Sequence, residues 1–302
     1  MMDPIYSRIA SNKRRTFFFF LLYAVLFIVI GYFVGIYLNE PLVGIILAGL
    51  VFVVIFLISF FGGKGVITSM AGAREVSKQQ EPFLYNTVEA LSIAAGKPMP
   101  KVYIIETEVP NAFAAGRKPE DAVIAVTRGL MKRLNRQELE GVIAHEMAHI
   151  SNYDVLLATV AVVLAGTIVF VSVIVRRMLI FGGMGRGGRK GNQGQIIALA
   201  AMIVLAVLAP IFAQLLRFAI SRQREYLADA TAADFTGYPE GLASALEKIT
   251  DMQIPKSPIE NSALNGLYIV NPAVGAQAVN RAAVLFSTHP PAAERIKRLR
   301  AM

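Results

Sequence analysis

Four uninterrupted apolar runs constrain this chain of 302 residues more than any other feature. The first two cover residues 16–38 and 41–61, and each is long enough to cross the hydrocarbon core of a bilayer as a helix. Only Asn39 and Glu40 separate them, so we predict a hairpin of two transmembrane helices. The first run is too long for a cleavable signal peptide, and a second span follows at once. The sequence therefore predicts an α-helical membrane protein whose N-terminal anchor occupies residues 1–77.

Basic residues flank the predicted hairpin on both sides, while its tip carries only Glu40. They are Arg8, Lys13, Arg14 and Arg15 before it, and Lys64, Arg74 and Lys78 after it. Because positive residues collect on the cytoplasmic side of a membrane, we expect both flanks to be cytoplasmic. The formal net charge of +9 is then explained by contact with the lipid bilayer, and we expect no nucleic acid partner.

Two further apolar runs, residues 155–175 and 196–218, are also of spanning length. The glycine-rich loop between them carries several basic residues, which conflicts with a position on the far side of the membrane. Either the pair crosses despite these charges, or it forms a hairpin packed on the protein or shallow in the membrane. In both cases the chain returns to its starting side, so segments 78–154 and 219–302 can build one catalytic domain.

The segment from residue 78 has the composition of a globular domain. Apolar residues at helical spacing predict a helix from Phe83 to Ala95, which ends before Gly96 and the prolines that follow. Three strand-like pieces come next, over residues 102–106, 110–116 and 122–127, with turn residues between the last two. We predict that they form a small antiparallel sheet in an α+β domain.

A helix is expected to begin after Asn135. Asn135 is followed three residues later by Glu138, the pattern of a capping box. This helix would continue through the stretch VIAHEMAHIS at residues 142–151, which contains two of the three histidines of the chain. The predicted small sheet would therefore lie beside a helix that carries both histidines.

His145 and His149 are four residues apart, so on a helix both side chains point to the same side and can bind one ion. Glu146 then lies beside the metal without ligating it, a position from which a carboxylate takes a proton from a water molecule that the metal acidifies. The alternative is a set of polar residues on an exposed helix face. The neighbouring residues are apolar, however, and unpaired polar groups among them would be costly.

A catalytic zinc site needs a third protein ligand and one open position. The chain has no cysteine and no further histidine near the motif, so we expect a carboxylate. Glu225 and Asp229 are four residues apart just after the fourth apolar run. This spacing allows Glu225 to bind the metal while Asp229 accepts the second ring N–H of a ligating histidine. The alternative is a solvated pair of charges with Arg222 and Arg224 as partners.

These features, in this order, resemble the HtpX-type membrane zinc metalloproteases, which are relatives of the CAAX prenyl endoproteases. The resemblance covers essentially the whole chain, including two anchoring spans and a second apolar pair. The motifs are NAFAAG at 111–116, HEMAH at 145–149, REYLAD at 224–229 and THPPAAERI at 288–296. HExxH alone is moderately specific, whereas the ordered set is highly specific.

The resemblance implies a zincin-like catalytic domain with a gluzincin mechanism and one Zn²⁺ per chain. His145, His149 and Glu225 look like the zinc ligands, and Glu146 looks like the general base. The residues that look like part of a substrate-binding edge strand are Asn111, Ala112, Phe113 and Ala114. An exposed strand edge binds extended peptides through main-chain hydrogen bonds, although an ordinary strand of the sheet is the alternative.

His289 and Arg295 match the C-terminal motif of the family, in which a similar pair stabilises the oxyanion of the tetrahedral intermediate. His289 would otherwise cap the final helix, which starts at the two prolines that follow it.

Four apolar segments are too few for the large multi-span chamber of the CAAX enzymes, so we do not expect processing of prenylated proteins. The layout is closer to bacterial-type quality-control proteases, which implies cleavage of unfolded, misfolded or damaged membrane proteins. It also implies a multi-pass protein of the plasma (inner) membrane with a cytoplasmic catalytic domain. The main alternative is a metal-binding but proteolytically inactive membrane scaffold. A transporter is disfavoured because the cores of the apolar runs contain no ionisable residues.

Overall fold

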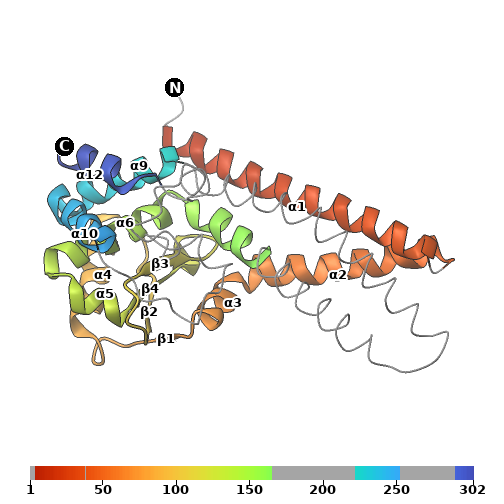
Figure 1. Ribbon diagram of the computed structural model, residues 1–302, viewed down its shortest axis with the longest axis horizontal. Coiled ribbons are helices and arrows are strands. Elements are labelled where there is room, and N and C mark those ends of the chain that lie inside the picture. Colours follow the sequence, from red (N-terminus) through yellow and green to blue (C-terminus); the bar gives the residue numbers. More distant parts are fainter. Residues whose placement is uncertain (1–3, 38, 165–221, 252–289) are drawn as a thin grey trace.

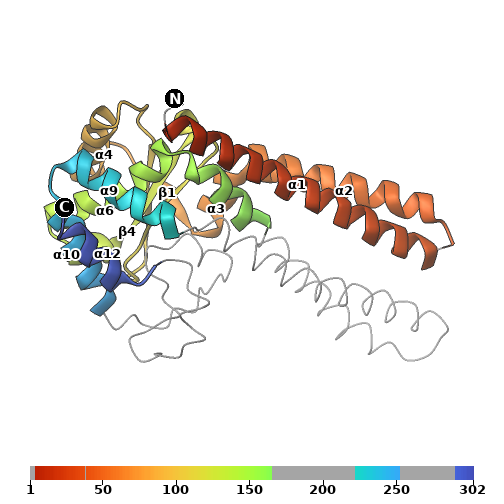
Figure 2. The same cartoon turned by 90° about the horizontal axis from the view of Figure 1, so that it is seen from above.

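The computed structural model describes residues 4–37, 39–164, 222–251 and 290–302. A long hairpin of helices α1 (Pro4–Tyr37) and α2 (Pro41–Phe61) projects from a body that contains the sheet and the shorter helices (Figures 1 and 2). Among the described helices, α2 has the length and hydropathy of a membrane span. The first predicted span lies in α1 as far as Tyr37. The third apolar run is described as far as Leu164, and the rest of it and the whole fourth run lie outside the described residues.

The hairpin is held together by close contact between backbones. A Cβ atom added at Gly44 would lie 2.2 Å from the carbonyl oxygen of Gly31, and one added at Gly31 would lie 2.6 Å from the Cβ of Ala48. Small residues at such a contact let two membrane helices approach closely. Large apolar side chains cover the outside of the hairpin, and Phe17 and Leu42 are 65% and 67% exposed. An apolar surface of this extent suits lipid rather than water.

The sheet has four described strands in the order β1-β2-β4-β3. Their bounds are Ala73–Glu75 (β1), Lys101–Ile105 (β2), Ala112–Ala115 (β3) and Val123–Thr127 (β4). Strands β2 and β4 are parallel, and the other two pairs are antiparallel. The prediction of an antiparallel sheet is therefore wrong: the sheet is mixed.

The reason for this difference lies in the connection after β2. The chain passes to the far edge to form β3 and then turns back, so that β4 fits between β3 and β2 and runs in the direction of β2. Strand β1 was not predicted, because three residues with two charged side chains carry no apolar alternation. The sheet thus begins within the segment that we assigned to the anchor.

Both faces of the sheet are covered. On one face, Ile104, Ala114 and Ile124 belong to the core formed with α4 (Pro82–Ala94) and α6 (Arg136–Ser151). On the other face, the alternate residues pack against α3 (Gly63–Met70) and a helix that we call the corner helix, Asp154–Leu164. Because a buried strand has apolar residues on both sides, β4 reads as a continuous apolar run followed by threonine.

The predicted start of α6 is confirmed. The side chain of Asn135 accepts a hydrogen bond from the backbone N–H of Glu138, and the Glu138 carboxylate accepts one from the backbone of Asn135. Glu138 also accepts hydrogen bonds from Ser244 Oγ at 2.8 Å and Lys248 Nζ at 2.9 Å. Both donors lie on α10 (Pro239–Asp251), so one buried carboxylate caps α6 and attaches α10 to it.

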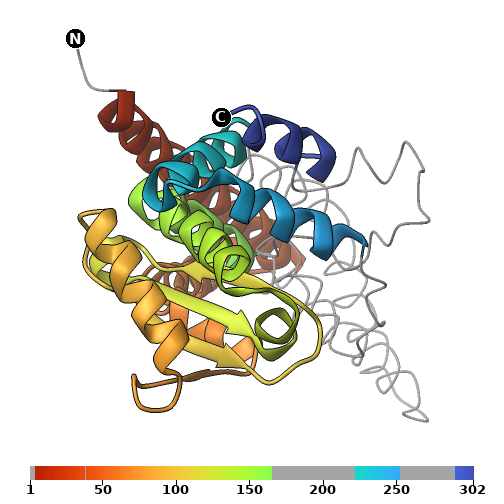
Figure 3. The ribbon, with the colours of Figure 1, turned by 90° about the vertical axis from the view of Figure 1, so that its left-hand side faces the viewer.

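Helix α6 lies between the strands and a second layer of helices (Figure 3). This layer contains α10 together with α9 (Arg222–Thr236), which contacts α6, and α12 (Ala292–Leu299), which contacts α9 and α10. The chain also forms two short helices, η1 (Pro119–Asp121) just before β4 in the sequence and α5 (Arg128–Arg133) just after it. Side chains from α6, α9 and α12 can therefore meet in one buried place.

Candidate metal centre

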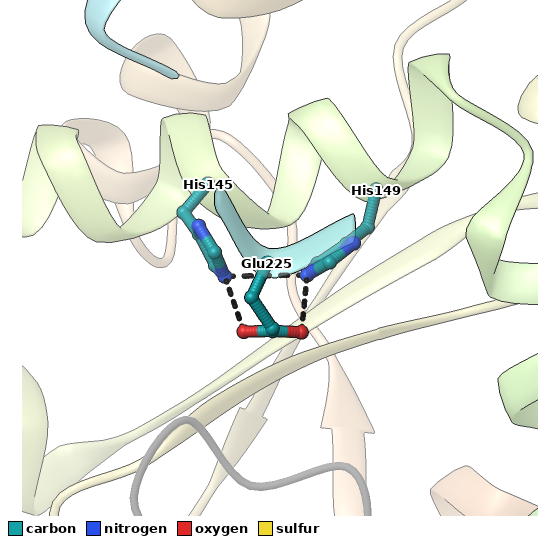
Figure 4. A group of neighbouring side chains, drawn as sticks. All are labelled: His145, His149 and Glu225. Atoms are coloured by element: carbon teal, nitrogen blue, oxygen red, sulfur yellow. Dashed lines mark hydrogen bonds and ion pairs between the residues drawn. The ribbon is translucent and has the colours of Figure 1, made fainter. Parts of the chain in front are cut away.

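Three potential metal ligands converge at the contact between α6 and α9 (Figure 4). His145 and His149 project from the same side of α6, and their Nε2 atoms are 3.2 Å apart. The carboxylate of Glu225 spans the pair, with one oxygen 3.6 Å from Nε2 of His145 and the other 3.5 Å from Nε2 of His149. His145 and Glu225 are almost completely buried, whereas the side chain of His149 is 16% exposed.

These separations suit a small tetrahedral ion. Donor atoms at about 2.0–2.1 Å from a tetrahedral zinc ion lie about 3.3 Å from one another. The three observed distances, 3.2, 3.5 and 3.6 Å, lie near this value. Two imidazoles and a carboxylate are also a donor set typical of catalytic zinc, which leaves one coordination position open. The side chains therefore fit a metal ion without rearrangement of the helices.

His145 is oriented by a buried ion pair. Its Nδ1 lies 3.0 Å from Oδ1 of Asp229, and the same carboxylate accepts two hydrogen bonds from Arg295, at 2.6 and 2.9 Å. Burial would raise the pKa of Asp229, but Arg295 and His145 lower it to about 2. Burial and the charge of Arg295 lower the pKa of His145, but hydrogen bonds to Asp229 and Glu225 outweigh them and raise it to about 9.

Glu225 and Asp229 are only 3% and 2% exposed. The alternative interpretation, in which they are solvated charges on a surface helix, is therefore wrong. Arg222 is exposed, and Arg224 lies 3.8 Å from Asp154. The buried cation beside the two carboxylates is instead Arg295, which is 1% exposed. This contact joins α9 to α12, and the sequence alone did not predict it.

His149 has a carboxylate partner that sequence reasoning missed. Its Nδ1 lies 3.2 Å from Oδ2 of Asp154, the first residue of the corner helix. The available signal was a carboxylate five residues after His149. On an uninterrupted helix, however, residues five apart are about 140° apart around the axis, so the spacing alone argued against a contact.

The remaining predicted site residues lie as follows. Glu146 is 4% exposed, and its charge helps to raise the pKa of Arg295 against the effect of burial. Ala112, Phe113 and Ala114 lie in β3, an edge strand of the described sheet that contacts α6, and Asn111 directly precedes this strand. Asn111 is 5% exposed, and its side chain accepts a hydrogen bond from the backbone N–H of Ala112. His289 lies outside the described residues.

Comparison with known proteins decides the family. The sequence pattern of Peptidase family M48 matches residues 78–302, which include all three potential ligands. The chain belongs to this family. Two relatives that match this chain over nearly its full length are both named protease HtpX homolog. The protein of Dictyoglomus turgidum is 47% identical over 98% of this chain and 94% of its own length. That of Streptococcus gordonii is 41% identical over 99% of this chain and 100% of its own.

The resemblance to HtpX-type proteases is thereby confirmed, and the protein is a membrane metalloprotease. A solved structure, that of S. mikatae Ste24p, matches with a TM-score of 0.49 and 17% identity over 97% of this chain and 67% of that one. An M48 metalloprotease uses a metal cofactor, and His145, His149 and Glu225 are the group of described residues able to hold one.

Proposed function

We propose that the protein is an integral membrane zinc endopeptidase in which His145, His149 and Glu225 hold one Zn²⁺ per chain. The observation that carries this proposal is the convergence of three ligand atoms at distances of 3.2–3.6 Å. Each histidine also has a carboxylate at its other ring nitrogen, an arrangement that orients imidazoles toward a metal. Bound zinc would lower the pKa of a water molecule and polarise a peptide carbonyl group.

Glu146 is proposed as the general base. It lies on α6 next to His145 and is almost completely buried, and its charge acts on Arg295, which lies 3.6 Å from Glu225. From this position it would take the proton of the attacking water, which leaves an oxygen able to attack the peptide carbon. Asp229 would keep Nδ1 of His145 protonated and its Nε2 free to bind metal, because it accepts the hydrogen bond at Nδ1.

The substrate is proposed to bind in an extended form along Asn111, Ala112, Phe113 and Ala114. Strand β3 is one of the two edge strands of the described sheet and contacts α6. An edge strand offers main-chain hydrogen bonds to any extended peptide, which suits a protease of broad specificity. His289 and Arg295 are proposed to stabilise the oxyanion. The Nε and Nη2 atoms of Arg295 hold Asp229, while Nη1 lies 3.6 Å from Glu225.

We further propose a multi-pass protein of the plasma (inner) membrane with a cytoplasmic catalytic domain. The corner helix follows His149 after only a few residues, and its apolar side chains pack with Phe20 and Phe56 of the hairpin. The metal ligands are thus close to helices that suit the bilayer. Unfolded, misfolded or damaged membrane proteins are the proposed substrates, and proteolytic quality control is the proposed role.

The decisive experiment compares Glu146→Gln with the unchanged protein in detergent, using an unfolded protein as substrate. We expect about one zinc per chain in both, and loss of cleavage in the variant. Glu140→Gln is the matched control, because it makes the same chemical change on α6 at a partly exposed position and should keep full activity. Cleavage by the Glu146 variant at the normal rate would overturn the proposed base. Metal binding without any chelator-sensitive cleavage by the unchanged protein would favour an inactive scaffold.

A further inference from the structure

The chain reverses sharply between the metal-binding helix and the corner helix. Helix α6 ends at Ser151, and the corner helix begins at Asp154 at an angle of 91° to it. Tyr153, in the turn, has a φ of 60°, a left-handed conformation that is uncommon outside glycine. This turn brings Asp154 back toward the last turn of α6, where His149 lies.

Asp154 occupies this position as a buried residue. It is 6% exposed, and its two carboxylate oxygens lie near His149 and Arg224, one on each. Oδ2 lies 3.2 Å from Nδ1 of His149, and Oδ1 lies 3.8 Å from Nη1 of Arg224, the neighbour of Glu225 on α9. A carboxylate here contacts one ligand directly and lies beside the helix that supplies another.

The corner helix gives Asp154 a fixed support. Val155, Leu157, Val160 and Leu164 are at most 2% exposed. Leu157, Val160 and Leu164 pack with aromatic side chains of α1 and α2. Further along, Thr159 Oγ1 accepts a hydrogen bond from the backbone N–H of Gly116 at 2.9 Å, just after β3. A helix held from both sides cannot easily rotate, so its first residue stays in one place relative to α6.

We infer that Asp154 is a positioning residue for the metal centre, which orients His149 by accepting the hydrogen bond from its Nδ1. With that proton fixed on Nδ1, the lone pair of Nε2 faces His145 and Glu225. A carboxylate at this position also makes the imidazole a stronger ligand. This inference rests on the proposed zinc site and adds to it a second orienting carboxylate, which corresponds to Asp229 at His145.

The test measures metal binding rather than cleavage. Metal-free protein in detergent is titrated with Co²⁺, whose visible absorption reports the geometry of its ligands, and with Zn²⁺ in competition with a chelator. We expect Asp154→Ala to weaken the affinity for both ions about 10- to 100-fold and to change the Co²⁺ spectrum. Asp154→Asn keeps an acceptor oxygen without the charge, so it should lie between the alanine variant and the unchanged protein.

Asp121→Ala is the matched control. Asp121 is a partly buried aspartate with two cationic partners, Lys64 and Arg117, but it lies away from the predicted ligands, and its loss should leave metal affinity unchanged. An alanine variant of Asp154 with normal affinity and a normal Co²⁺ spectrum would overturn the inference. If that variant does not fold, as judged by its thermal melt, Asp154→Asn decides: affinity within about twofold of the unchanged protein would then refute it. Failure of the unchanged protein to bind either metal would instead refute the zinc site itself.

Discussion

His145 is 1% exposed, and the carboxylate at its Nδ1 is clamped by two hydrogen bonds from an arginine. The side chain of His149, in contrast, is 16% exposed, and its carboxylate partner, Asp154, comes from the turn that follows α6, with Arg224 3.8 Å from this carboxylate. The His145 side of the centre is assembled from α6, α9 and α12, whereas the His149 side is assembled mainly from α6 and the corner helix.

This difference indicates two ways of fixing a ligand. A buried ion pair is costly to form but holds its geometry strictly, because neither charge can be left without the other. A hydrogen bond from a slightly exposed histidine to a carboxylate at a turn is weaker than a buried ion pair, and it depends on the backbone that presents the carboxylate. We therefore expect changes on the His145 side to act on folding and metal affinity together, and changes on the His149 side to act mainly on the metal.

Arg295→Ala should have the largest effect. It would leave Asp229 and Glu225 buried without the cation that lies 2.6 and 3.6 Å from them. Removing one partner of a buried ion pair costs about 3–5 kcal/mol, and we expect the free energy of unfolding in detergent to fall by this amount. Arg298→Ala, on the same helix but with half-exposed contacts to Glu294 and to the ring of Tyr226, should cost only about 1 kcal/mol. Equal losses in the two variants would show that burial does not distinguish them.

Asp229→Asn should weaken zinc binding about 10- to 100-fold and change its dependence on pH. In the metal-free chain the pKa of His145 is raised to about 9, so zinc must displace a proton and its affinity should rise with pH up to that value. The amide of the variant would lack the charge that supports this proton, and the rise should level off at lower pH. Titrations against a chelator at several pH values would measure both effects.

The same raised pKa has a consequence for stability without metal. Because the folded state favours the protonated imidazole, the stabilisation is complete below the ordinary pKa of 6.5 and is lost as the pH rises through about 9. Thermal melts of metal-free protein should show this loss in the unchanged chain and much less of it in Asp229→Asn. Identical pH profiles would contradict the assigned hydrogen bond.

The sequence predicted those parts of the centre that depend on local geometry. His145 and His149 share one face of α6 because they are four residues apart, and the capping box at Asn135 marked where that helix begins. Glu225 and Asp229 likewise share one face of α9, since both reach His145. Helical periodicity is a property of neighbouring residues, so one sequence is enough to read it.

The sequence did not predict contacts that depend on how distant segments meet. Alternating apolar residues mark a strand but not its direction, so the parallel pairing of β2 and β4 was missed. Arg295 and Asp229 are 66 positions apart, and no local pattern relates them. Asp154 is close in sequence to His149, but its contact requires the turn at Tyr153.

Thr159→Val should have a smaller effect, on the side of the corner helix. Thr159 is 0% exposed, and valine has nearly the same shape but cannot accept the hydrogen bond from Gly116. A buried N–H without an acceptor costs about 1–3 kcal/mol, which chemical unfolding in detergent would detect. Because Gly116 follows β3 directly, we also expect KM for an unfolded substrate to rise more than kcat falls. The packing of the corner helix against the hairpin remains in this variant, so metal affinity should change little, and a large loss of zinc would show that the hydrogen bond of Thr159 is needed to keep Asp154 in place.

Asn135→Ala should have the smallest effect and should not distinguish the two sides. The side chain of Asn135 accepts a hydrogen bond from the backbone N–H of Glu138 at 2.9 Å, and loss of such a cap costs about 1 kcal/mol. Both histidines project from α6 more than two turns beyond this cap, so a loosened first turn should lower stability while His145 and His149 keep their separation. Asn135→Asp keeps an acceptor oxygen and should restore most of the loss. If Asn135→Ala weakened zinc binding as strongly as Asp229→Asn, the rigidity of the whole helix, rather than the orienting carboxylates, would control the metal centre.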